Sequence, residues 1–195
     1  MTILNLGAGE KRYDGALNVD IMEAPHIDIV ADLSVYPWPW TDNSVDGIHA
    51  SHLLEHFPID GQEKFIRECH RILKPGGFLR LVVPHCTNMS SLGCFGHWKC
   101  FSHDTFQRYL DVQGSIDAYM FKGIRFKTVD QRVNWVWEET VKQNNLNVDD
   151  WMRVLVRPLD TVISWLINLG PRWFERFWYP IVGGASEVVW KGIKV

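Results

Sequence analysis

The chain has 195 residues, a length that suits one domain with a sizeable hydrophobic core. Hydrophobic residues make up 46% of it, which excludes general disorder, and a net charge of −3 without a long basic run gives no support to nucleic-acid binding. No secretory signal opens the sequence, its apolar runs are too short to span a bilayer, and its 4 cysteines are scattered. We therefore expect a cytoplasmic protein.

Strands and helices alternate in the first part of the chain. Short apolar runs bounded by turn residues predict five strands, and apolar residues at three- and four-residue intervals predict a helix before the fifth. Such alternation is typical of a parallel sheet that binds its ligand at the carboxyl ends of the strands. The stretch from Gly7 to Leu17 is too short for a full helix, so we expect either a turn or one brief helical segment there. The predicted strands are 3–6, 16–21, 27–31, 45–50 and 78–83, and the helix covers 65–73.

The pattern changes after Pro84. Residues 85–103 form a polar loop rich in Cys, His, Ser and Gly. A short helix at 105–110, a strand at 124–136, a helix at 149–167 and a final strand at 187–195 are expected to follow it. No repeat or linker divides the sequence, so we expect a single domain, 1–195, with a ligand-binding core at 1–84 and an elaborated part at 85–195.

Three short segments near the start carry ligand-binding signals. Gly7-Ala8-Gly9 follows the first strand, and its glycines let a ligand approach the backbone closely. Asp20 ends the second strand, where a carboxylate can accept hydrogen bonds from both hydroxyls of a ribose, although a solvated turn residue is the alternative. Asp32 ends the third strand and would contact an adenine amino group, with Leu33 covering the ring, or would act as a turn or N-cap residue. Arg12 replaces the third glycine of the dinucleotide pattern, which disfavours a nicotinamide-dependent dehydrogenase.

Six segments in this order resemble the S-adenosylmethionine (SAM)-dependent methyltransferases of the type 11 group. The resemblance implies an α/β, Rossmann-like class I methyltransferase fold: a mostly parallel twisted sheet with helices on both faces, here with an aromatic-rich helical C-terminal elaboration. The segments are LNLGAG at 4–9, NVDI at 18–21, ADL at 31–33, PWTDNSVD at 39–46, SHLLEH at 51–56 and RILKPGG at 71–77.

The resemblance also implies which residues hold the cofactor SAM. The glycine turn, the ribose-binding acid and the adenine-contacting pair of the family match residues of this chain, and the backbone of Ser51 matches the position that meets the methionine end. The implied cofactor-binding residues are Gly7, Ala8, Gly9, Asp20, Ile21, Asp32, Leu33 and Ser51.

Two departures from the family pattern stand out. Asn5 occupies a position where many relatives have an acid, which would weaken the hold on the amino group of the cofactor. The chain also starts at its first strand without the usual preceding helix, so we expect cover for the cofactor from elsewhere, such as a partner chain. The resemblance gives Glu55 and His56, at the start of the helix after the fourth strand, a structural role or a place around the cofactor.

The polar loop follows the fifth strand, where the family binds its methyl acceptor. We expect His97 or His103 to orient the acceptor or to take its proton, with Asp104 a weaker candidate; the alternative is a loop held by its own hydrogen bonds. The same loop contains four possible metal ligands at three-residue intervals, with His85 and Cys86 upstream in the sequence: Cys94, His97, Cys100 and His103. This step is not a standard zinc spacing, so we assign no metal site.

The segment 151–180 is rich in aromatic and apolar residues. It is interpreted either as core or a lid over the sheet, which the composition favours, or as an interfacial helix that contacts a membrane through tryptophans and arginines. Both interpretations give the acceptor pocket aromatic walls. One side of the predicted helix carries Trp151, Val154, Leu155, Leu159, Val162, Ile163, Leu166 and Ile167, and the arginines are Arg153, Arg157, Arg172 and Arg176.

These features predict methyl transfer from SAM to a small-molecule, sugar or lipid-linked acceptor, at oxygen. The alternative from a different class is a SAM-binding subunit without transfer activity that serves a partner chain. We expect no nucleic-acid partner, and peripheral membrane contact and self-association both stay open.

Overall fold

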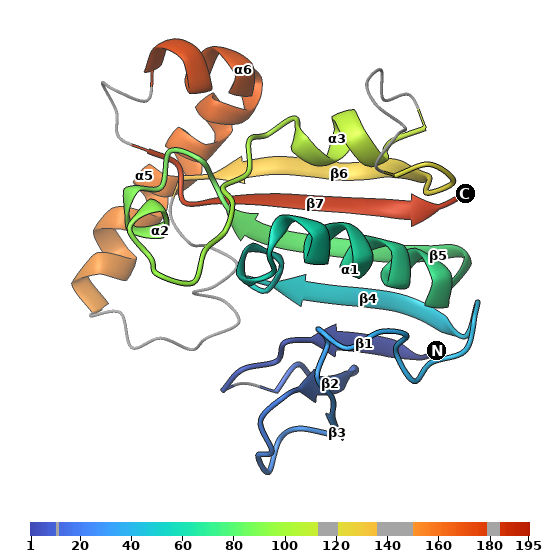
Figure 1. Cartoon of the computed structure of the whole chain (residues 1–195). Helices are drawn as coiled ribbons and strands as arrows, with labels where there is room; N and C mark the ends of the chain where they lie inside the picture. Colours follow the sequence, from blue (N-terminus) through green and yellow to red (C-terminus); the bar gives the residue numbers. More distant parts are fainter. Residues whose placement is uncertain (11, 113–120, 136–149, 179–183) are drawn as a thin grey trace.

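A seven-stranded sheet in the order β3-β2-β1-β4-β5-β7-β6 forms the centre of the molecule (Figure 1). The computed structural model describes all residues except 11, 113–120, 136–149 and 179–183. β7 runs antiparallel to its two neighbours, and the pairs from β3 to β5 are parallel. The strands are β1 (Ile3–Leu6), β2 (Leu17–Asp20), β3 (Ile29–Val30), β4 (Val45–Ser51), β5 (Leu73–Pro84), β6 (Phe126–Asn134) and β7 (Glu187–Lys194).

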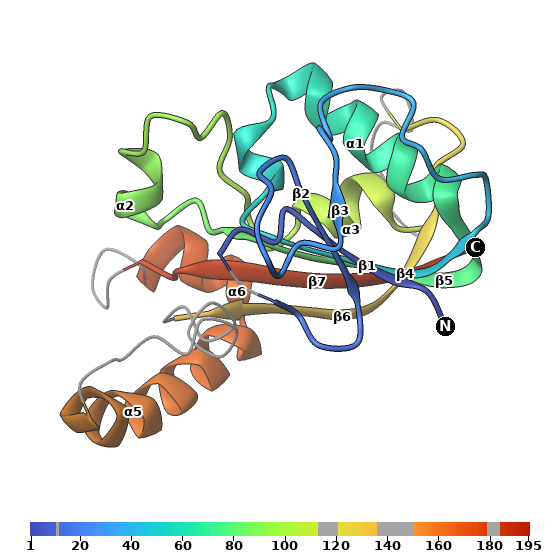
Figure 2. The same ribbon diagram turned by 90° about the horizontal axis from the view of Figure 1, so that it is seen from below.

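Helices lie on both sides of this sheet. Figure 2 shows α1 and α3 against one face, while α5 lies on the other side beyond β6. α1 is amphipathic and buries Phe65, Ile66 and Cys69 against the strands, because these residues recur at helical spacing. The helices are η1 (Leu54–His56), α1 (Ile59–Ile72), α2 (Met89–Leu92), α3 (Thr105–Leu110), α5 (Asp150–Leu169), α6 (Pro171–Trp173) and η2 (Phe174–Trp178).

Strand alternation separates an apolar face of the sheet from a polar one. On the polar face, a row of neighbours crosses four strands: Asn5 lies opposite His49, His49 opposite Arg80, and Arg80 opposite Lys191. Burial, together with the nearby charges of Arg80 and Lys191, lowers the pKa of His49 to about 4, so this imidazole is neutral at pH 7. The Lys191 ammonium in turn lies 4.4 Å from the ring centroid of Phe78.

The predicted fold class is confirmed, with differences at the ends of elements. The third strand shrinks to two residues, because an edge strand has only one neighbour to pair with. The fifth begins earlier than expected, because Leu73 already pairs with Val45 before a register shift. The predicted strand 124–136 is observed as Phe126–Asn134, and Val136 lies outside the described residues.

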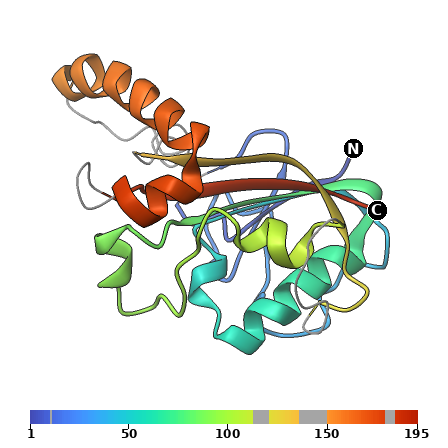
Figure 3. The same ribbon diagram turned by 90° about the horizontal axis from the view of Figure 1, so that it is seen from above.

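The C-terminal helix α5 covers the sheet with only part of its predicted apolar side. Ile163 and Ile167 pack in a small cluster with Val133 and Phe174. The other apolar side chains that the structure describes on this side are exposed, because α5 lies along the edge strand β6 and projects beyond it (Figure 3). The core-or-lid interpretation is therefore wrong for Leu159, Val162 and Leu166, which are 50%, 53% and 53% exposed, while the side chains of residues 150–158 lie outside the described residues.

Candidate functional site

The glycine turn and Asp20 lie together at the carboxyl ends of β1 and β2. Gly7 and Gly9 have φ of 65° and 60°, the left-handed region that side chains with a Cβ rarely adopt. Oδ2 of Asp20 accepts a hydrogen bond from the backbone N–H of Gly9 at 2.8 Å, and Oδ1 accepts one from Met22 at 3.0 Å. The carboxylate of Asp20 therefore faces the glycine turn, as its predicted role requires.

The two glycines have different neighbours. A Cβ at Gly7 would lie 2.6 Å from Cδ1 of Leu53, so this glycine allows the segment after β4 to pack on the turn. A Cβ at Gly9 would meet no heavy atom within 4 Å, so the space beside Gly9 is open to a ligand. Ser51, which ends β4 half-buried, lies at the same edge of the sheet. The turn thus has one closed side and one open side.

Asn5, which departs from the family pattern, has a structural partner. Its side-chain amide donates to Oδ1 of Asn18 at 3.0 Å, and Asn18 in turn donates its backbone N–H to Asp28 at 2.8 Å. Oδ1 of Asn18 also accepts from the backbone N–H of Tyr13 at 2.8 Å. These buried amides fasten the short connection between β1 and β2.

The two residues expected to contact the adenine ring, Asp32 and Leu33, are only partly arranged as predicted. Asp32 is exposed, and its Oδ1 accepts from the backbone and the hydroxyl of Ser34, which lowers the pKa of this carboxyl. Leu33 is 6% exposed and packs in the core, so its side chain does not stand free to cover a ring. Ile21 and Met22, next to Asp20, are 61% and 73% exposed and are apolar side chains available at this place.

These residues fit SAM. The open side of Gly9 leaves room for the nucleoside, and each oxygen of Asp20 has a second lone-pair site for a ribose hydroxyl after binding its backbone partner. Ser51 and the segment ending at Leu53 lie beside the turn, where the methionine part would extend. When bound, SAM supplies a methyl group already activated by its sulfonium.

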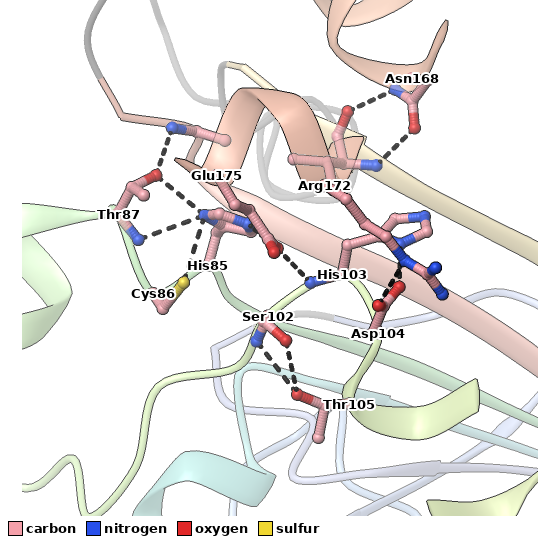
Figure 4. Close-up of polar contacts among 12 residues, drawn as sticks. His85, Cys86, Thr87, Ser102, His103, Asp104, Thr105, Asn168, Arg172 and Glu175 are labelled. Carbon is pink, nitrogen blue, oxygen red and sulfur yellow. Dashed lines mark hydrogen bonds and ion pairs between the residues drawn. The ribbon is translucent and has the colours of Figure 1, made fainter. Parts of the chain in front are cut away.

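The loop after β5 is tied to the segment after α5 by Glu175. Its Oε1 accepts from the backbone of His103 at 2.6 Å and lies 3.0 Å from Nε2 of His85, as Figure 4 shows. Burial opposes ionisation of Glu175, but His85 and the His103 amide outweigh it and hold the pKa of Glu175 below its usual range. Nδ1 of His85 is 2.8 Å from the Thr87 hydroxyl, so both of its ring nitrogens are engaged.

His103 belongs to the same network. Its Nδ1 lies 2.9 Å from Oδ1 of Asp104, and Gln131 donates to its carbonyl. Arg172 contacts the other oxygen of Asp104 at 2.6 Å (Figure 4). Burial opposes ionisation of Asp104, yet His103 and Arg172 keep its pKa below its usual range. His103 is thus oriented by a carboxylate, whereas His97 is held elsewhere by the Ser91 hydroxyl, 2.8 Å from its Nδ1.

An open pocket of about 350 Å³ lies between α3 and the α6–η2 segment. Four cationic side chains, Lys99, Arg108, Arg172 and Arg176, line it together with two acids, Asp104 and Glu175. Both acids already have partners within the network around His103. The pocket therefore carries more positive than negative charge.

Sequence reasoning missed a buried charge cluster at the end of β4. Glu55 and Glu187 are both 0% exposed, and each has a carboxylate oxygen 3.3 Å from a ring nitrogen of His52. Burial disfavours the imidazolium, but the hydrogen bond to Glu187 and the contact with Glu55 outweigh it and raise the pKa of His52 to about 9. Asn134 donates to Glu187 at 2.7 Å. The one signal in the sequence was an acid directly before the apolar residues 188–190 of β7.

Comparisons with known proteins give the class. A family profile described as "Methyltransferase domain" matches residues 10–81. A SAM-dependent methyltransferase from Archaeoglobus fulgidus shares the fold with a TM-score of 0.60 and 17% identity, over 99% of this chain and 86% of its own. A search of curated proteins finds no match in sequence.

Two further structures share the fold. A 1,6-didemethyltoxoflavin-N1-methyltransferase from Burkholderia thailandensis, with bound S-adenosylhomocysteine, has a TM-score of 0.54 and 14% identity, over 100% of this chain and 71% of its own. A Haloferax volcanii methyltransferase complex with the Trm112 activator has a TM-score of 0.51 and 14% identity, over 98% of this chain and 81% of its own.

The fold is the Rossmann-like fold of class I methyltransferases. Over residues 10–81 the chain is similar to the methyltransferase-domain family, and the solved structures that share its fold include SAM-dependent methyltransferases. The three solved structures share only 14% to 17% identity with the chain, so their likeness supports the fold and not a particular acceptor.

Proposed function

We propose that this enzyme transfers the methyl group of SAM to an oxygen of a small-molecule, sugar or lipid-linked acceptor that carries an anionic group. Gly7, Ala8, Gly9, Asp20, Ile21, Asp32 and Ser51 would bind the cofactor, Leu33 would support them from the core, and residues 85–195 would bind the acceptor. The observation that carries the acceptor class is the surplus of positive charge in the pocket between α3 and η2. Arginine and lysine side chains in such a pocket favour phosphate or carboxylate groups.

His103 lies beside this pocket, between two residues that line it. Its neighbours Ser102 and Asp104 line the pocket, and the Asp104 carboxylate fixes the orientation of its ring. A base oriented by a second group is the arrangement that removes a hydroxyl proton as the methyl group arrives. We propose that His103 takes this proton, and that His97 orients the acceptor at the other end of the loop.

Replacement of two pocket cations tests the acceptor class. Cell extract is incubated with methyl-labelled SAM, and labelled products are separated by anion exchange. We expect the label in an anionic product, as a methyl ether that resists hydrolysis. We expect Lys99→Ser/Arg176→Ser to reduce the yield of this product at limiting acceptor by about tenfold or more, because each charged hydrogen bond contributes roughly 1.5–3 kcal/mol. SAM binding should be unchanged.

Lys127→Ser is the matched control, because Lys127 is an exposed cation on β6 outside the pocket. A neutral labelled product, or equal yields from the control and the double variant, would contradict the anionic acceptor. Methyl label on nitrogen or sulfur would contradict transfer to oxygen.

A second observation favours an acceptor at a membrane surface. The outer side of α5 presents an exposed apolar stripe, which consists of Leu159, Val162, Trp165, Leu166 and Leu169. Arg172 and Arg176 follow it in the chain and line the anion pocket. No helix among the described residues is long and apolar enough to cross a membrane. We therefore propose peripheral contact of residues 151–180 with the cytoplasmic face of a membrane.

Vesicle binding tests this contact. Sedimentation with vesicles of anionic phospholipid should pull down the wild-type chain, and Leu166→Ser/Leu169→Ser should weaken this binding at least tenfold, because each buried leucine contributes about 1.5–3 kcal/mol. Val129→Ser is the control, since Val129 is 52% exposed on β6 and lies outside the stripe. If Leu166→Ser/Leu169→Ser and Val129→Ser bind vesicles equally well, the stripe does not contact lipid.

A partner subunit is the remaining alternative. One structural neighbour is a complex with an activator protein, and a second copy of the chain is the other partner we consider. The labelling experiment distinguishes these roles: SAM binding without any labelled product would favour a subunit that needs an absent partner.

A further inference from the structure

Two histidines and a glutamate meet where the loop after β5 folds back on η1. The backbone N–H of Trp98 donates to the carbonyl of Glu55 at 2.8 Å, which fastens the loop to η1. The rings of His56 and His97 then lie 4.8 Å apart, edge to face. One ligand-type atom each from Glu55, His56 and His97 lies within 4.8 Å of the other two. Since the residues come from two distant segments, no spacing in the sequence shows this cluster.

Each of the two histidines is held through its Nδ1 atom, and its other ring nitrogen is the candidate for binding a ligand. Nδ1 of His56 lies 3.2 Å from the carbonyl of Gly96, and a carbonyl can only accept, so this nitrogen carries the proton. Nδ1 of His97 lies 2.8 Å from the hydroxyl of Ser91. Metal-binding histidines are oriented by such a contact of the second nitrogen. Among the described residues, the recorded contacts of both rings are made by Nδ1, so we assign coordination to the Nε2 atoms.

Glu55 supplies an independent observation. Its side chain is 0% exposed, and neither carboxylate oxygen has a hydrogen-bond partner with good geometry among the described residues. Nδ1 of His52 lies 3.3 Å from Oε1 as an ion-pair contact only. A buried carboxylate without hydrogen bonds is costly unless another group compensates it. The His52 ring compensates Oε1 at 3.3 Å. A cation between Glu55 and the two histidines would be a partner for Oε2, which has no hydrogen-bond partner among the described residues.

We propose that Glu55, His56 and His97 bind a divalent transition-metal ion, with Zn²⁺ as the ion that best suits the ligands. Two imidazoles and one carboxylate form a known catalytic zinc set, which leaves positions for water or a substrate oxygen. His56 is exposed while Glu55 is buried, so the site opens toward solvent on the histidine side. A role of the ion in holding the acceptor oxygen rests on the function proposed above, but metal binding does not.

A second cluster of similar composition lacks these features. His85, Cys86 and Glu175 also lie close together. However, both ring nitrogens of His85 are engaged by Thr87 and Glu175, and Glu175 accepts from the backbone of His103. The hydrogen bonds of that cluster are satisfied from within the chain, so we assign it a structural role.

Calorimetric titration with Zn²⁺ tests the proposal on chain that carries no histidine tag and has been treated with a chelator. We expect one saturable site per chain. His56→Asn/His97→Asn should weaken binding by at least roughly 100-fold, Glu55→Gln should weaken it strongly, and Ser91→Ala should weaken it by roughly 10–100-fold through loss of the contact that orients His97. Co²⁺ should give a visible absorption band in the wild type that the double variant lacks.

Cys94→Ser is the matched control, because Cys94 is an exposed ligand-type residue of the same loop that stands outside the cluster. It should bind Zn²⁺ like the wild type. SAM titration of every variant reports on the fold and on the cofactor site separately. The metal proposal is overturned if SAM binds normally and Zn²⁺ does not, or if the double variant keeps the wild-type affinity for Zn²⁺.

Discussion

Gly9→Ala is expected to weaken SAM binding at least tenfold, which corresponds to about 1.4 kcal/mol. The substitution adds a Cβ on the open side of the turn, where no heavy atom of the described chain lies within 4 Å. In the free protein this methyl group meets nothing, so only its left-handed backbone costs stability, by about 1–2 kcal/mol. In the complex it would occupy space that the nucleoside needs. Calorimetric titration with SAM measures the difference.

Gly76→Ala separates the two effects. Gly76 has φ of 80° and an equally open Cβ position, but it lies at the start of β5, at the opposite edge of the sheet from the glycine turn. Both alanine variants should therefore lose similar stability in thermal unfolding, and only Gly9→Ala should lose affinity for SAM. If the two variants bind SAM equally well, the cofactor does not lie against Gly9, and the assignment of the turn fails.

How much the sequence predicts depends on the range of the interactions involved. β1, β4 and α1 were predictable because their buried apolar residues recur at the short intervals typical of a strand or a helix. The glycine turn and Asp20 were predictable because they lie close together in the sequence. Because the turn and the acid together match a known pattern, the sequence alone predicts the fold class and the cofactor. Their contact, the hydrogen bond from Gly9 to Asp20, is what the parallel pairing of β1 and β2 produces.

The acceptor side was less predictable, because its contacts join distant segments. Glu175 reaches His85 and His103 across the sheet edge, and Glu55 reaches His97 through a loop closed by backbone hydrogen bonds. Sequence spacing instead drew attention to the regular steps of Cys94, His97, Cys100 and His103, of which only His97 belongs to the cluster near Glu55. Periodicity identifies a helix face but not the partner of that face, so the exposure of Leu159, Val162 and Leu166 was missed in the same way.

Tryptophans in the C-terminal part have opposite environments, and Trp190→Ala tests what the buried one contributes. Trp190 is 0% exposed, packs against Phe106 and Phe126 with centroids 5.4 Å and 5.6 Å away, and donates through Nε1 to Thr128 at 3.1 Å. Removal of the indole would leave a cavity and an unpartnered hydroxyl, and truncation of a buried tryptophan costs about 3–5 kcal/mol. We expect a fall in the midpoint of thermal unfolding of about 10 °C or more.

Trp165→Ala is the matched control for this loss. Trp165 is 61% exposed on the outer side of α5, so its removal should change the free energy of unfolding by no more than about 0.5 kcal/mol. The same variant should bind anionic vesicles less well, whereas Trp190→Ala should act on stability alone while it stays folded. Equal destabilisation by the two substitutions would mean that α5 packs its outer side against the rest of the chain, and the membrane-facing assignment of the stripe would then be wrong. The pair therefore distinguishes tryptophans that hold β7 in the sheet from those that α5 presents to a partner surface.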